Sequence, residues 1–226
     1  MVADLVLSLA DNKQLLGMRY AEWSSATPTL EADIAAAAMG LDDLGHARVL
    51  YGCLSELDGD PRGPERDSDP ATWRNVAFLD ESWTRWDQFV AANAILDTAF
   101  TLVIEALVEG EVEILRTRLR KMLSEERFHL LHGRAWLKEG VDQDVVREAQ
   151  RQAAVFFGPE DQRLPGTRVS GRELREKLEV PAAQVDWERW DPLRRRSDPG
   201  QIDARTFDML TGLLEKRYNL APSRES

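Results

Sequence analysis

Residues 27–57 read TPTLEADIAAAAMGLDDLGHARVLYGCLSEL and predict one long helix with an apolar stripe. Thr27 is the expected N-cap, with Pro28 at the first helical position. An acid and a histidine, Asp43 and His46, interrupt the stripe three residues apart, on the face that should be buried. Because a buried carboxylate is costly when nothing meets it, we expect a cation, a metal ion or a hydrogen-bond donor beside Asp43.

A second helix carries the same arrangement in SEERFHLLHG, residues 124–133, where Glu126 precedes His129 by three residues. The helix expected between these two contributes a further acid, Asp97, again on an apolar stripe. Two acid-x-x-His helices together with single acids from two others form the metal site of four-helix carboxylate bundles. The sequence therefore predicts a common polar centre containing Asp43, His46, Asp97, Glu126 and His129.

The first helix should supply the remaining acid of such a site. On its expected buried stripe it offers an amide, Gln14, while Asp11 lies a turn earlier and Glu22 two turns later. Two interpretations of the centre remain open. It is either a metal site that lacks one carboxylate, or a buried network in which protonated histidines pair with the acids and no metal binds.

The hydrophobic pattern is helical almost throughout, and no alternation is long enough for a sheet. The sequence predicts an all-α antiparallel four-helix bundle with additional C-terminal helices. Residues 1–158 form the bundle, and residues 159–226 form an extension that packs on it and is not an independent domain. The expected helices span about 3–24, 27–57, 81–108, 111–139 and 142–158, with a last helix after 201 and a loop at 58–70.

Composition excludes several function classes. The formal net charge of −11 argues against nucleic acid as a partner. No apolar run reaches the roughly 18 residues of a membrane span, and the N-terminus lacks the basic residues of a signal peptide. A single cysteine, Cys53, cannot form an intramolecular disulfide. We expect a cytoplasmic protein.

The stretches LADNKQLLGMRYAEW (9–23), 27–57 and SEERFHLLHGRAWL (124–137) resemble the phenylacetic acid catabolic proteins, over roughly residues 5–140. The resemblance implies a ferritin-like fold. It also implies one of two related subunits of a ring-epoxidising oxygenase that acts on phenylacetyl-CoA. The A-type subunit of that family is catalytic and holds two irons, whereas the C-type subunit is a structural partner with an incomplete or lost metal centre.

Carried over by position, Asp43, His46, Asp97, Glu126 and His129 stand where the catalytic type has ligands, and Gln14 stands where it has a glutamate. Chain length and the opening residues resemble the C type. The leading expectation is a non-catalytic subunit without cofactor that docks on an A-type subunit, as a homodimer or hetero-oligomer, with no nucleic acid and no membrane. The alternative is a di-iron oxidase or oxygenase in its own right, and a third possibility is a ferritin-like storage protein.

Overall fold

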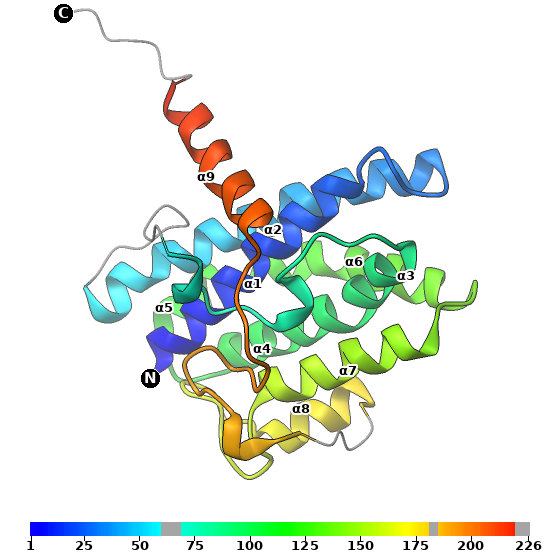
Figure 1. Cartoon of the computed structure of the whole chain (residues 1–226). Helices are drawn as coiled ribbons and strands as arrows, with labels where there is room; N and C mark the ends of the chain where they lie inside the picture. Colours follow the sequence, from blue (N-terminus) through cyan, green and yellow to red (C-terminus); the bar gives the residue numbers. More distant parts are fainter. Residues whose placement is uncertain (60–68, 181–184, 220–226) are drawn as a thin grey trace, which may run out of the picture.

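The computed structural model describes residues 1–59, 69–180 and 185–219, and these residues contain helices and two isolated bridges but no strand. This confirms the all-α class (Figure 1). The helices are α1 Val2–Trp23, α2 Leu30–Asp58, α3 Trp86–Ala91, η4 Ala92–Asp97, α4 Thr98–Val108, α5 Glu113–Arg118, α6 Met122–Leu137, α7 Gln143–Phe157, α8 Gly171–Leu178 and α9 Ala204–Asn219. Residues 60–68 of the expected loop lie outside the described residues.

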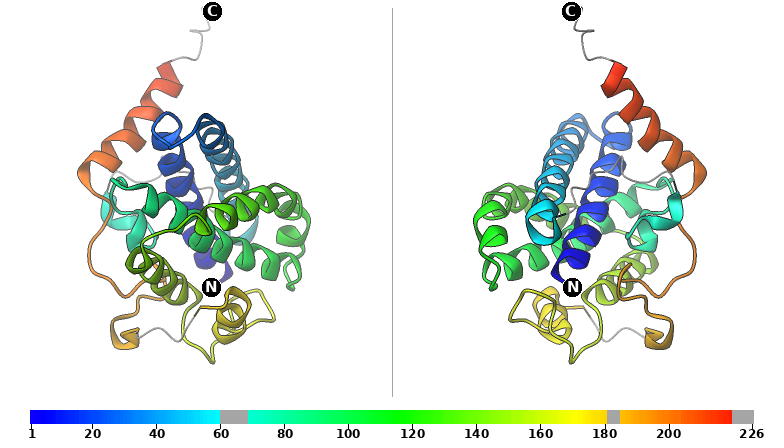
Figure 2. Two further views of the ribbon diagram at one scale, coloured as in Figure 1. Left: turned by 90° about the vertical axis from the view of Figure 1, so that its right-hand side faces the viewer. Right: turned by 90° about the vertical axis from the view of Figure 1, so that its left-hand side faces the viewer.

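Helices α1 and α2 pair along most of their length (Figure 2). Their backbones approach closely at two glycines, since a Cβ on Gly17 would lie 2.9 Å from the carbonyl oxygen of Gly40. The cap of α2 lies two residues later than the sequence predicts. Thr29 is the N-cap and accepts a hydrogen bond from the amide of Ala32, whereas Thr27 donates through its backbone amide and its hydroxyl to Asp33.

The third long helix differs from the expected regular helix of residues 81–108. It begins at Trp86, and its middle six residues, η4, form a π-helix between α3 and α4. π-Helical turns hold an extra residue and are frequent at functional sites, and this one ends at Asp97. The span from Trp86 to Val108 has the length and composition of a membrane-crossing helix, yet 78% of its most apolar window is buried within the bundle.

The expected fourth helix, 111–139, is broken. Helix α5 ends at Arg118, and α6 begins at Met122 after a short turn. Helix α8 lies between residues 158 and 201, where the sequence predicts no helix, and Ser170 and Glu173 form a capping box at its start. Figure 2 shows α8 on the side of the bundle away from the α1–α2 pair.

The C-terminal segment is tied to the bundle by buried arginines. Arg196 donates to both carboxylate oxygens of Asp80, at 3.0 and 2.8 Å. Arg19 of α1 donates to the hydroxyl of Thr206 near the start of α9, at 2.6 Å. Helix α9 then projects away from the bundle (Figure 1).

Helix α6 packs against the π-helix through Gly133, and this contact leaves no room for a side chain. A Cβ there would lie 2.7 Å from Cα and 2.8 Å from N of Ala94. We expect Gly133→Ala to lower the free energy of unfolding by about 1–3 kcal/mol, because two backbones must separate. The control is Gly52→Ala in α2, where a Cβ meets nothing within 4 Å and helix propensity should stabilise by up to about 1 kcal/mol. Equal denaturation midpoints for the two variants would contradict this packing.

Candidate functional site: a buried polar centre

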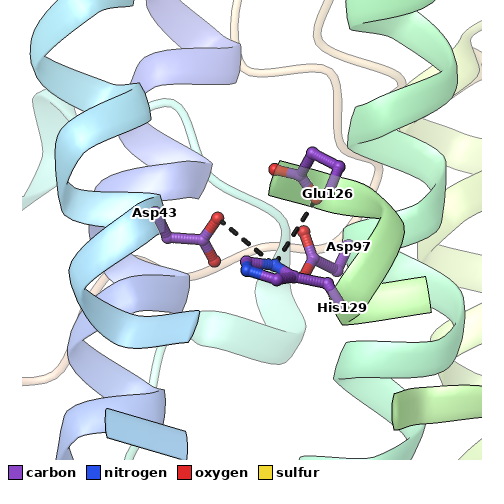
Figure 3. Close-up of side chains that lie close together, drawn as sticks. All are labelled: Asp43, Asp97, Glu126 and His129. Atoms are coloured by element: carbon purple, nitrogen blue, oxygen red, sulfur yellow. Dashed lines mark hydrogen bonds and ion pairs between the residues drawn. The ribbon is translucent and has the colours of Figure 1, made fainter. Parts of the chain in front are cut away.

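Four acidic or histidine side chains from three helical segments converge in the middle of the bundle (Figure 3). Asp43 comes from α2, Asp97 from the end of η4, and Glu126 and His129 from α6. One ligand atom of each lies within 4.8 Å of the others, and all four residues are buried. The structure therefore brings together side chains that lie more than eighty residues apart in the sequence.

A lysine from α1 occupies the space between the carboxylates. Lys13 is fully buried, and its Nζ donates to Oδ1 of Asp43 at 2.8 Å and also to Asp97 and Glu126. The residue of α1 that reaches the centre is thus Lys13, which is fully buried, whereas Gln14 is only half-buried. The two residues differ by 100° around the helix. The sequence prediction chose Gln14 because α1 is buried on nearly every side. Such a helix has no polar face that would show which side points to the centre.

His46 links the buried centre to the surface. Its Nδ1 lies 2.9 Å from Oε1 of Glu126 and 3.6 Å from Oδ1 of Asp43, and its Nε2 lies 2.9 Å from Oε2 of Glu125. The side chain of Glu125 is 31% exposed. The structure thus brings His46 to the centre, and it adds Glu125, which the sequence pattern did not single out.

His129 also contacts the carboxylates, with its ring centroid 6.4 Å from that of His46. Its Nδ1 is 2.9 Å from Oδ2 of Asp97, and its Nε2 is 3.5 Å from Oδ2 of Asp42, whose side chain is 42% exposed. The backbone carbonyl of His129 accepts a hydrogen bond from Nδ2 of Asn93 in the π-helix, at 3.1 Å. The π-helix therefore positions both Asp97 and the α6 segment that faces it.

Two hydroxyl groups add hydrogen bonds to two of the acids, whereas Oδ2 of Asp43 is buried without a hydrogen-bond partner among the described residues. Tyr20 donates to Oδ2 of Asp97 at 3.1 Å, and Thr101 donates to Oε2 of Glu126 at 2.9 Å. Burial and the neighbouring carboxylates raise the pKa of Tyr20 well above its usual value, so that it remains a donor.

Electrostatics keep the basic groups of the centre protonated. Burial alone would lower the pKa of Lys13, but the charges of three carboxylates outweigh it and raise that pKa well above its usual value. Burial likewise opposes protonation of the histidines. The nearby carboxylates of Asp43 and Glu126 nevertheless raise the pKa of His46 to about 10, and the charge and hydrogen bond of Asp97 raise that of His129 to about 9.

The pKa values of the acids shift in different directions. Burial and the charge of Asp97 raise the pKa of Asp43. The pKa of Asp97 is lowered, because Lys13 and His129 outweigh its burial. Three carboxylates thus face three basic groups, and the charges of the centre balance within the protein itself.

By ligand type and spacing, Asp43, Asp97, Glu126 and His129 could hold a metal ion. Lys13 does not fit that role. Its ammonium already contacts the oxygens that would coordinate the ion, and a divalent cation placed there would meet a positive charge inside a dry site. A metal ion can enter only if the Lys13 side chain leaves the centre.

Sequence reasoning missed Lys13, although a signal for it exists. Its neighbours one turn away on either side are Leu9, Ala10, Leu16 and Gly17, so the lysine interrupts an apolar face just as Asp43 does. Because Lys13 and Asp43 carry opposite charges on helix faces that are expected to be buried, the sequence predicts a buried ion pair between them.

A helical bundle in which two acid-x-x-His pairs meet a further acid belongs to the ferritin-like class of carboxylate bundles. The profile of the phenylacetic acid catabolic protein family matches residues 1–176. The chain therefore belongs to that family. It is 30% identical over 150 residues to a protein of Escherichia coli (strain K12) that is named as the C-type subunit of 1,2-phenylacetyl-CoA epoxidase, and the match covers 65% of this chain and 60% of the relative's length.

Removing the buried ammonium should be costly, since it leaves three carboxylates crowded in a water-free site. We expect Lys13→Met, which keeps the side-chain length, to lower the free energy of unfolding by about 3–5 kcal/mol. Chemical denaturation measures the change. Lys138→Met, at the exposed residue that follows α6, is the matched control and should stay within about 0.5 kcal/mol of the parent. A small effect for both variants would mean that the ion pairs do not stabilise the fold.

Proposed function

We propose that the chain is a non-catalytic subunit of a phenylacetyl-CoA 1,2-epoxidase in phenylacetate degradation, and that it stabilises the catalytic di-iron subunit of that complex. The observation that carries the proposal is Lys13, whose ammonium lies where the acids of the bundle converge. The name of the Escherichia coli relative supports a place in a multi-subunit epoxidase.

Lys13 favours this proposal over the catalytic alternative. A redox-active metal site needs carboxylates that are free to bridge ions and open positions for oxygen. Here the carboxylates are engaged by Lys13, by two histidines and by the hydroxyl groups of Tyr20 and Thr101. The chain keeps the buried acids of a metal bundle, and the lysine serves as their counter-ion.

An exposed apolar helix face supports a docking role. The segment from Ile34 to Leu41 contains no charged residue, and these two side chains are 63% and 73% exposed on the face of α2 opposite the centre. Leu30 extends this face, and the neighbouring α6 exposes Phe128 and Leu131. Large exposed apolar side chains gathered on adjacent helices mark a surface that a partner covers. The occupant we propose is the A-type catalytic subunit, in the cytoplasm.

Iron content tests the absence of a working metal centre. We expect the purified chain to retain no stoichiometric iron after anaerobic loading with Fe(II) and desalting, and Lys13→Glu to gain iron, because that change removes the competing cation and adds a ligand. Metal analysis per chain is the measurement. About two irons per parent chain, lost in Asp43→Ala, would establish the di-iron oxidase alternative instead.

Binding to the A-type subunit encoded in the same genome tests the docking role. Leu41→Arg places a charge in the proposed interface and should weaken the complex at least about tenfold, measured by calorimetry on purified subunits. Leu193→Arg is the control, since Leu193 is a 47% exposed leucine outside α2 and α6. If the parent chain fails to bind the A-type subunit, the subunit role is wrong. If Leu41→Arg binds as the parent does, the interface lies elsewhere.

A further inference from the structure

A half-enclosed cavity opens between α4 and α6, and Lys177 of α8 also lines it. Its volume is about 310 Å³, within the range of small-molecule sites. Leu102 of α4 and Leu123 and Leu130 of α6 form the apolar part of its walls, and charged and hydroxyl side chains line the rest. At its inner end lie Thr101 and Glu126, whose side chains are hydrogen-bonded to each other at 2.9 Å.

A second, more open cavity of about 510 Å³ adjoins the first at Leu123, which lines both. It lies at the C-terminal end of α4, where Arg116, Arg120 and Arg168 surround Gly110. From Leu123 to Arg134, α6 alone rises roughly 16 Å. The two cavities therefore form one elongated depression with an apolar inner part and a basic outer part.

Positive charge is concentrated along this depression, although the chain as a whole has a net charge of −11. The first cavity carries Arg127, Arg134 and Lys177 together with Glu105 and Glu126, and the second carries its three arginines together with Glu109. Within the described part of the chain, five of these six basic side chains have no hydrogen-bond or ion-pair partner, and the exception, Arg168, lies 3.9 Å from Glu111.

Unpaired cations beside an apolar cavity are the complement of an amphipathic anion. Arginine binds phosphate and carboxylate groups through parallel hydrogen bonds, and the walls above Thr101 can cover an acyl or aryl group from water. We propose that this depression is a binding site for an elongated organic anion. Its apolar end enters the cavity between α4 and α6, and its phosphate or carboxylate groups lie against the arginines.

The site is separate from the contacts that Lys13 makes and from the exposed face of α2, and its existence does not depend on the proposed subunit role. Only the inner wall, at Glu126 and His129, is shared with the buried centre. A ligand in this cavity would lie beside the centre without entering it. Binding to the isolated chain therefore tests the site without any partner.

Calorimetric titration of the full chain with three probes tests the proposal: phenylacetyl-CoA, which has both an aryl end and phosphates, coenzyme A, which lacks the aryl group, and phenylacetate, which lacks the phosphates. We expect the thioester to bind more tightly than either fragment. Arg120→Glu should weaken the thioester and coenzyme A at least about tenfold and leave phenylacetate unchanged. Tight binding of phenylacetate that only Arg134→Glu weakens would also support the site, with a carboxylate ligand confined to the inner cavity.

The control variant is Arg147→Glu in α7, whose side chain is 64% exposed and pairs with Asp144 away from both cavities. It should bind every probe as the parent does, at equal ionic strength. Circular dichroism melting verifies that the substituted chains remain folded. Two results would overturn the proposal: no saturable binding of any probe at millimolar concentration, or equal losses in Arg147→Glu and the cavity variants.

Discussion

The ammonium of Lys13 is the charge around which the bundle is assembled. Three carboxylates from three other helical segments point at it, and none of them could remain ionised in this dry interior without a nearby cation. A side chain of α1 thereby fixes the positions of η4, α2 and α6. Two protonated histidines contact the same acids, His46 at Oε1 of Glu126 and His129 at Oδ2 of Asp97, so that the pairs form one connected network.

That network requires helices that approach closely and in register. Gly17 and Gly40 bring the backbones of α1 and α2 together, which lets a lysine on one reach an acid on the other. Gly133 allows α6 to lie directly against the π-helix, and Asn93 binds the carbonyl of His129 there. The glycines thus set short distances between the helices, and these short distances allow the charged side chains to form their ion pairs.

The helical class and the acids of the centre could be predicted from periodicity, because Asp43, Asp97 and Glu126 each interrupt an apolar stripe. Periodicity fails for α1, because a helix that is buried on nearly every side has no polar face. The apolar stripe therefore predicts that Gln14 points inward, whereas in the structure Lys13 does. It also cannot detect a π-turn, which depends on tertiary packing, or the short turn after Arg118 that separates α5 from α6.

A counter-ion that is covalently part of the chain has a consequence for how the protein is made. Carboxylate bundles that rely on metal reach their final stability only after the ion arrives. In this chain the neutralising charge is translated with helix α1 and cannot be lost to a chelator, to oxidation or to iron starvation. The proposed counter-ion role therefore predicts that the bundle reaches its final stability without iron, before any metal-dependent partner has acquired its cofactor.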